Sequence, residues 1–276
     1  MKIVPILSGG GTRLPAYIGV LKGLDELKVE FNQMVGVSGG SIIAAMYCAG
    51  YTLDQMYKLA LETNFKQFKE FSIYHLFKHG GLSSGDKFER WMDNQLKGKT
   101  FADLELDLNI LATDVNGGGP VIFNKHISPN LKVASAVRFS MSIPLIFSFK
   151  NFEDHLLVDG AILSEDALFC DWSGCGIPVF CFRLKSQLER RKLKKSFFPL
   201  PQYIMLLIRT FMTTLSREYV PNGYWLNTIV IDTGKTSAVD FEMSDLEKQQ
   251  LFNAGFQTVL DHLPRKLATS ASKTYT

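Results

Sequence analysis

The stretch from Gln33 to Ala49 constrains the fold of this chain more than any other part of its sequence. A short apolar run, Gln33–Val37, passes through the pattern G-x-S-x-G and enters a run of small apolar residues, which predicts a strand, a tight turn and a helix. The serine at the tip of such a turn is exposed, and glycines flank it because larger side chains would collide across the turn. The pattern makes Ser38 a candidate nucleophile, with an ordinary glycine turn as the alternative.

Strands and helices alternate along the rest of the chain. Apolar runs and helical spacing predict strands at 3–7, 106–112, 121–124, 155–158, 177–182 and 227–231, and helices at 16–27, 53–61, 86–97, 132–139 and 244–262. Such alternation is typical of an α/β fold with a mainly parallel sheet covered on both faces. We expect a single domain over residues 1–265, a lid or membrane-docking insertion at 184–219, and a flexible tail at 266–276.

Composition excludes several classes of protein. The net charge is +3, from 30 basic and 27 acidic residues, which does not suggest a nucleic-acid binder. The sequence has no run of 18 apolar residues and no signal-peptide core at its start, so we expect a cytoplasmic protein without a spanning helix. The four cysteines have neither disulfide-framework nor zinc-site spacing, which predicts free thiols and no metal.

The sequence offers no convincing histidine base for Ser38. In an α/β-hydrolase several strands precede the nucleophile, whereas only one strand and one helix precede Ser38 here. The late histidine, His262, lies in a predicted helix without a glycine-rich loop nearby. The other histidines have no telling context either: His75, His79, His126 and His155.

A second glycine-rich loop, Gly9-Gly10-Gly11-Thr12-Arg13, lies at the end of the first predicted strand. A nucleotide-phosphate loop fails on detail, since Leu14 replaces the third glycine of G-x-G-x-x-G and no Gly-Lys-Ser/Thr follows. The alternative is an oxyanion hole, in which bare backbone N–H groups gather beside the neighbouring serine turn.

Several ordered motifs resemble those of the patatin-like phospholipases. The three central ones are Gly9–Arg13 with Gly19-Val20-Leu21, Gly36–Ser41, and Asp159-Gly160-Ala161. The likeness runs over about residues 3–163 and includes Gly81-Leu82 with Gly85-Asp86, Leu111–Asp114 and Ala134–Pro144. The sequence departs from the family at Leu14, Glu165 and Ala167, which affects local loop geometry.

The resemblance implies a three-layer α/β/α sandwich and a Ser38–Asp159 catalytic dyad. Asp159 would accept the proton of Ser38, and no metal or cofactor would take part. The oxyanion would be held by the amides of Gly9, Gly10, Gly11 and Gly39, and Arg13 would support the loop without being catalytic. Asp114 and Asp232, also near strand ends, are rival bases that only the motif match disfavours.

The activity implied by the resemblance is metal-independent cleavage of phospholipid carboxylic esters through an acyl-serine intermediate. A soluble carboxylesterase or thioesterase on the same site, and an inactive patatin-like binding protein, are the alternatives. Bacterial relatives include effectors that degrade membranes, some of them switched on by nucleotides, and nothing in this sequence indicates such a switch. The expected partners are a lipid ester and, transiently, a membrane surface.

A basic segment is the candidate for that membrane contact. Residues 183–195 carry seven basic residues and one acidic residue, a net charge of +6, and apolar residues follow from Phe197. The predicted docking residues are Arg190, Arg191, Lys192, Lys194 and Lys195. A nucleotide- or protein-binding loop, or a solvated loop before a core helix, would explain the same charges. A second apolar and basic stretch, Phe65–Lys78, suits part of a lid or a buried helix equally well.

Overall fold

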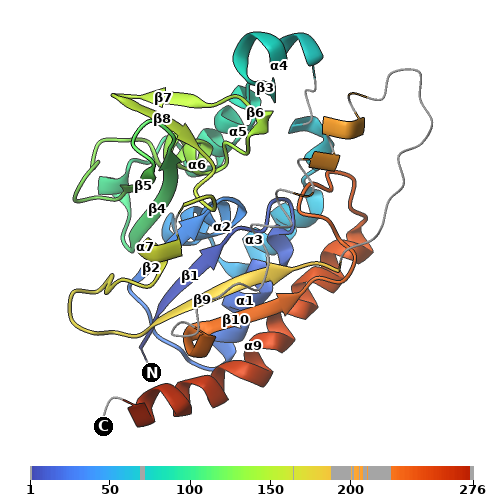
Figure 1. Cartoon of the computed structure of the whole chain (residues 1–276). Helices are drawn as coiled ribbons and strands as arrows, with labels where there is room; N and C mark the ends of the chain where they lie inside the picture. Colours follow the sequence, from blue (N-terminus) through green and yellow to red (C-terminus); the bar gives the residue numbers. More distant parts are fainter. Residues whose placement is uncertain are drawn as a thin grey trace.

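The computed structural model of the chain describes residues 2–68, 72–163, 165–187 and 225–273, with residues 200, 202–204, 206, 207 and 210 between the last two ranges. Its centre is an eight-stranded sheet in the order β10-β9-β1-β2-β4-β8-β7, with β5 also paired to β4 (Figure 1). Five strands are parallel: β1 (Val4–Ser8), β2 (Gln33–Val37), β4 (Asp107–Asp114), β9 (Val179–Lys185) and β10 (Thr228–Asp232). Three are antiparallel to their neighbours: β5 (Gly119–Phe123), β7 (Lys150–Phe152) and β8 (His155–Val158).

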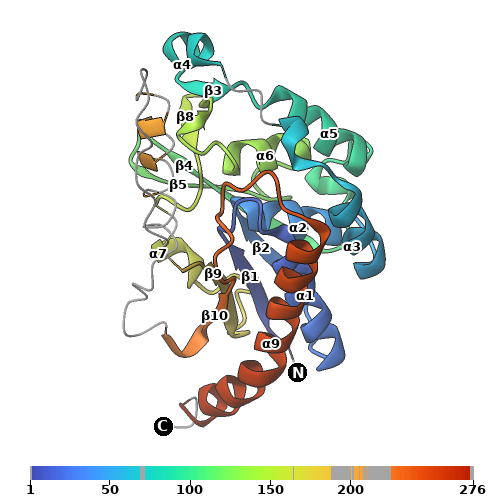
Figure 2. The same ribbon diagram turned by 90° about the vertical axis from the view of Figure 1, so that its right-hand side faces the viewer.

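Helices cover the two faces of the sheet unevenly. The larger core lies under one set of helices (Figure 2): α1 (Leu14–Glu26), α2 (Gly39–Cys48), α3 (Leu53–Glu62), α5 (Asp86–Leu96), α6 (Val133–Ser140) and α9 (Asp245–Lys273). A smaller core on the opposite face includes Val35, Val37 and Leu111 and is covered by α7 (Glu165–Leu168) and the loop after it. The predicted α/β fold with a mainly parallel sheet is therefore confirmed.

A second, small sheet sits beside the main one. It pairs β3 (Gly81–Ser83) with β6 (Leu145–Phe147), and α4 (Ile73–His79) precedes it. Short 3₁₀ helices complete the structure at η1 (Phe65–Phe68), η2 (Phe101–Asp103) and η3 (Trp225–Asn227). The sequence patterns predict neither strand of this sheet, because each has only three residues.

The register of the main sheet brings two distant segments together. Strand β2 runs parallel to β4 and ends with Val37 opposite Leu111. Strand β8 runs antiparallel to β4 and ends with Val158 opposite Thr113. Since β5 occupies the other edge of β4 over residues 110–114, β2 and β8 share one edge and meet end to end near Ala112. The residues that follow these two strands, Ser38 and Asp159, are thus directed at one point.

Helix α9 is longer than the sequence predicts. It continues through Pro264 to Lys273 instead of ending near His262, so most of the predicted flexible tail is helical. Leu263 and Leu267 lie in the main core, which explains the continuation, because burying them stabilises the extra turns. None of the helices in the described ranges combines the length and apolarity needed to cross a membrane.

Candidate active site

Ser38 occupies a strained turn between β2 and α2. Its backbone has φ 53° and ψ −129°, a conformation that is rare for residues other than glycine. The turn needs its glycines: a Cβ on Gly36 would lie 2.6 Å from Ser41 Cα, and one on Gly40 would lie 2.1 Å from the Leu7 carbonyl oxygen. The G-x-S-x-G pattern therefore has a steric cause in this structure.

Asp159 follows β8 and meets Ser38 across 121 residues of sequence. The Ser38 Oγ donates a hydrogen bond of 2.7 Å to Asp159 Oδ2, and both residues are fully buried. The Ala161 amide donates to the other carboxylate oxygen, Oδ1, at 2.9 Å. The two residues predicted as a dyad are thus in proton-transfer geometry.

Burial changes the acid–base properties of Asp159. Desolvation raises the pKa of its carboxyl group to about 6, and the hydrogen bonds from Ser38 and Ala161 offset part of that rise. A carboxylate with this pKa is still ionised at neutral pH, yet it accepts a proton more readily than an exposed aspartate does.

The glycine-rich loop packs against the serine turn, and its amides have different partners. A Cβ on Gly39 would lie 2.4 Å from the Gly11 carbonyl oxygen, so the two motifs touch. The Gly9 N–H donates to Val37 O at 3.0 Å, and its carbonyl accepts from Gly40 N–H. Among the hydrogen bonds of the described residues, none uses the amide of Gly10 or Gly11. Gly9 therefore fastens the loop to the turn, which corrects its predicted place among the oxyanion donors.

Arg13 is fully buried and ties this loop to the far strands of the sheet. Its guanidinium donates to Gly10 O at 3.1 Å, to Thr233 Oγ1 at 2.9 Å and to Leu184 O at 3.3 Å. Burial lowers the pKa of Arg13 to about 10, so it stays charged at neutral pH. These contacts fit the predicted supporting role, since they fix the loop through its carbonyl and leave its amides available.

The C-terminal end of α6 connects the two halves of the site. Ser140 Oγ accepts from the Ser38 amide at 2.8 Å and donates to Leu111 O at 2.6 Å. The carbonyl oxygens of Ser140 and Ser142 accept from the amides of Gly160 and Asp159, at 3.2 and 3.0 Å. This turn therefore sets the position of nucleophile and carboxylate together. The sequence predicts no role for it, although it lies in the stretch Ala134–Pro144 that carries the family resemblance.

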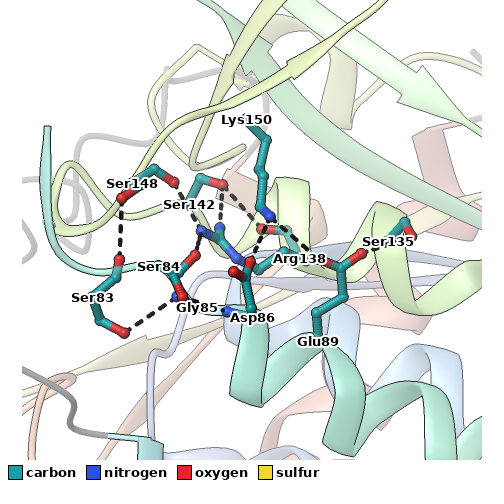
Figure 3. A network of polar contacts seen from close by, with 10 residues as sticks. All are labelled: Ser83, Ser84, Gly85, Asp86, Glu89, Ser135, Arg138, Ser142, Ser148 and Lys150. Carbon is teal, nitrogen blue, oxygen red and sulfur yellow. Dashed lines mark hydrogen bonds and ion pairs between the residues drawn. The ribbon is translucent and has the colours of Figure 1, made fainter. Parts of the chain in front are cut away.

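Arg138, one turn earlier, anchors that end of α6 (Figure 3). Its guanidinium donates to Ser142 Oγ at 2.6 Å and to the carbonyl oxygens of Ser84 and Ser148 at 2.6 and 2.8 Å. It is fully buried, and a Cβ on Gly85 would lie 2.3 Å from its Nε. Arg138 thus joins α6 to the small sheet. It also fixes the side chain of Ser142, the residue that follows Met141 in the sequence.

Comparison with known proteins identifies the family. The family model of the patatin-like phospholipases matches residues 6–168, more than half of the chain. The chain belongs to this family. The match contains Ser38, Asp159 and the glycine-rich loop, whereas Leu184 and Thr233, which bind Arg13, lie after it.

Relatives of the same family span very different protein lengths. The chain is 26% identical to YqhO of Bacillus subtilis (strain 168), described as uncharacterized, over 92% of this chain and 96% of that protein. It is 22% identical to the probable lipid hydrolase 463L of Invertebrate iridescent virus 6, over 91% and 85%. It is 28% identical to the neuropathy target esterase sws of Drosophila grimshawi, over 58% of this chain and 11% of that protein.

Solved structures share the fold at low sequence identity. VipD from Legionella pneumophila matches 96% of this chain with a TM-score of 0.66 and 14% identity, over 67% of VipD. The type III effector ExoU matches 96% of this chain with a TM-score of 0.57 and 15% identity, over 53% of ExoU. At this identity the likeness establishes the patatin-like fold alone.

The rival bases have other hydrogen-bond partners than Ser38. Asp114 binds His155 Nδ1 at 2.9 Å and three backbone amides, and Asp232 is exposed and accepts from the Gly234 amide. Among the hydrogen bonds of the described residues, none joins a histidine to Ser38 or Asp159. In the same ranges no three histidine, cysteine or carboxylate side chains gather as a metal-binding set.

An apolar cavity begins beside Ser38. Met141, whose Sδ lies 3.9 Å from Ser38 Oγ, and Gly11 form part of its wall. The rest of the wall is largely aromatic and aliphatic, including Ile42, Phe65, Phe68, Phe88, Trp91, Ile143 and Phe147. Its volume is about 40 Å³, room for about three water molecules. The predicted docking residues Arg190, Arg191, Lys192, Lys194 and Lys195 lie outside the described residues.

Proposed function

We propose that this protein is a lipid acyl hydrolase that cleaves phospholipid carboxylic esters with Ser38 as nucleophile and Asp159 as general base. The observation that carries the proposal is the 2.7 Å hydrogen bond between these two fully buried side chains. The lipid hydrolase and esterase names of the relatives 463L and sws support the substrate class.

In the first half of the reaction, Ser38 Oγ attacks the ester carbonyl carbon as Asp159 Oδ2 takes its proton. The resulting oxyanion is held by the amides of Gly10, Gly11 and Gly39. Gly39 is the first residue of α2, where the helix dipole also favours negative charge. When the intermediate collapses, the C–O bond breaks and Asp159 returns the proton to the leaving alcohol. The acyl group stays on Ser38.

In the second half, Asp159 takes a proton from water, which attacks the acyl-serine. Collapse of the second intermediate breaks the bond to Ser38 Oγ, which recovers the proton, and a fatty acid leaves. Because a carboxylate is a weaker base than histidine, the rate depends on prepositioned donors and on the raised pKa of Asp159.

The apolar cavity is where the acyl chain would lie. It starts at Gly11 and Met141, so a chain attached to the reacting carbonyl points toward the aromatic wall formed by Phe68, Phe88 and Trp91. With a volume of about 40 Å³, the cavity accepts a long chain only when these side chains turn aside.

The test measures fatty-acid release from mixed phospholipid vesicles, hydrolysis of a soluble short-chain ester, and labelling by a fluorophosphonate. We expect Ser38→Ala to be folded and inactive in all three assays. The matched control is Ser128→Ala, which should behave like the wild type. The Ser128 hydroxyl donates a hydrogen bond to Asn124 O in the loop after β5. Hydrolysis of the soluble ester without vesicle cleavage would favour the soluble esterase or thioesterase. Absence of labelling and of hydrolysis in the wild type would favour an inactive binding protein.

A further inference from the structure

Helix α4 exposes two aromatic side chains to solvent. Tyr74 and Phe77 have exposed fractions of 74% and 78%, and they lie three residues apart, so they project from the same side of the helix. Exposure of two neighbouring aromatic rings is costly in water. The helix instead packs on the molecule through Leu76, which contacts the small core, and through His75, whose Nδ1 lies 2.8 Å from Gly81 O.

Two further segments with exposed apolar side chains adjoin α4 or share its small core. Leu145 begins β6 and pairs with Gly81, and Phe149 follows the strand, where a Cβ on Gly80 would lie 2.9 Å from its ring. Leu145 also has φ 69°, so strain accompanies its exposure.

The third segment is made of residues 200, 202–204, 206 and 207, which are helical and expose Leu200, Tyr203 and Leu207 at helical spacing. Ile204 of this segment and Leu76 of α4 pack on the same small core of Leu82, Ile143, Ile146, Phe147 and Ala238.

These side chains define what we call the docking face: Tyr74, Phe77, Leu145, Phe149, Leu200, Tyr203 and Leu207. Seven of the twelve large exposed apolar side chains in the described ranges belong to it, so the exposure is concentrated rather than scattered. In Figure 1, α4, β3 and β6 lie together at one end of the molecule. Such concentration on three separate segments marks an interaction surface.

The docking face is connected to the candidate active site. Three residues of the small core beneath it, Ile143, Phe147 and Ala238, also line the apolar cavity that starts beside Ser38. The small core beneath the docking face and the wall of the cavity therefore share side chains.

The charge around the docking face indicates what covers it. Helix α4 carries His75, Lys78 and His79 and no acidic residue. In the sequence, the segment 183–195 with its net charge of +6 ends five residues before Leu200. Aromatic residues combined with basic ones match an anionic bilayer, whose interior takes the rings while its head groups attract the cations.

We propose that the docking face binds the surface of an anionic lipid bilayer and so presents lipid to the cavity. The inference rests on the proposed function, because a lipid hydrolase must reach its substrate in a membrane. Binding to the membrane itself needs no turnover. Ser38→Ala should therefore bind vesicles as tightly as the wild type.

The experiment is co-sedimentation with vesicles of phosphatidylcholine alone and of phosphatidylcholine with 30% phosphatidylglycerol. Tyr74→Ser combined with Phe77→Ser should bind the anionic vesicles about tenfold or more weakly. The matched control combines Ile127→Ser with Leu246→Ser, which removes two apolar side chains exposed by 67% and 64% elsewhere, and should bind like the wild type. Thermal unfolding confirms that both double variants are folded.

Equal binding by the two double variants would overturn the docking face. So would the finding, by sedimentation velocity, that the α4 variant abolishes a dimer, since the face would then join two copies of the chain. Hydrolysis of the soluble ester by the wild type tests the proposed function separately from the docking face. If the wild type binds vesicles through the docking face and cleaves no ester, the proposed function fails and the docking face stands.

Discussion

Two buried aspartates on neighbouring strands of this protein have opposite acid–base properties. Asp114 ends β4 and Asp159 follows β8, and the exposed fractions of the two residues are 5% and 0%. The pKa of Asp114 is lowered to about 2, whereas that of Asp159 is raised to about 6. Desolvation by burial is the dominant cause at Asp159, whereas hydrogen bonds, that with His155 first, dominate at Asp114.

Asp114 has enough donors to hold a full negative charge. The hydrogen bond with His155 Nδ1 lowers the pKa of Asp114 most. The amides of Asn116, Gly117 and Leu156 each donate to its carboxylate at 3.0 Å. This carboxylate fastens the β4–β5 turn to β8 and has little tendency to take a proton.

Asp159 receives only the Ser38 hydroxyl and the Ala161 amide, so desolvation outweighs them. The comparison teaches that a carboxylate becomes a usable base here by being buried with few donors, one of which is the nucleophile itself.

The largest expected effect is on turnover. Asp159→Asn preserves the shape of the side chain but cannot take the Ser38 proton, so we expect vesicle and soluble-ester hydrolysis to fall by about 10³-fold. Asp114→Asn should keep most of its activity per folded molecule and show a lower Tm, because the amide side chain cannot accept all four hydrogen bonds. If Asp159→Asn stays fully active while a histidine substitution abolishes activity, the base has been misassigned.

The second effect concerns the pH dependence of kcat/KM. Because the base must be unprotonated, kcat/KM for the soluble ester should fall about tenfold per pH unit below about pH 6. Asp114 stays ionised over this range and contributes nothing to the profile. A rate that remains constant down to pH 5 would contradict the raised pKa of Asp159.

A smaller effect is expected from the turn that positions both residues. Ser140→Ala removes the acceptor of the Ser38 amide, and we expect kcat to fall about tenfold with KM unchanged, as one hydrogen bond to the reacting group is worth about 1.4 kcal/mol. The rate of fluorophosphonate labelling should fall in parallel, and Ser140→Thr should restore it. Loss of stability with an unchanged labelling rate would make Ser140 merely structural.

A separate effect is on stability rather than on rate, and it has opposite signs for the two aspartates. Between about pH 4 and 6 the folded state binds the extra proton at Asp159, so the unfolding free energy decreases as pH rises, by on the order of 3 kcal/mol. Asp114 acts in reverse: its contribution is present above its unfolded pKa and is lost as pH falls toward 2.

Asp159→Asn should therefore unfold at a higher urea concentration than the wild type at pH 7.5, with the difference shrinking toward pH 5. A less stable Asp159→Asn variant at pH 7.5 would show that the buried charge is better compensated than its hydrogen bonds indicate.

Much of the fold is predictable from the sequence because its signals are local. Apolar runs place β1, β2, β4 and β8 close to their observed bounds, and Thr52 with Gln55 forms the capping box that its spacing predicts at the start of α3. The small sheet is missed, because strands of three residues leave no periodic pattern. A helix is one of the two interpretations of Phe65–Lys78, and α4 (Ile73–His79) forms at the end of that stretch. Helix α9 is cut short, because Leu263 and Leu267 are stabilised by distant contacts rather than by local propensity.

For the candidate site, the sequence by itself determined the turn around Ser38 and the glycine-rich loop, because each is a local pattern of glycines between a strand and a helix. Most of the close contacts that require those glycines are distant in the sequence, such as Gly11 with Ala238 and Gly40 with Leu7. The sequence also supplied several aspartates at strand ends. Only the tertiary structure decided which of them meets Ser38, because β2 and β8, which are more than a hundred residues apart in the sequence, converge on one edge of β4. It likewise decided that the Gly9 amide is already bonded and that the Asp159 pKa is raised, because donor occupancy and desolvation depend on everything packed around a group.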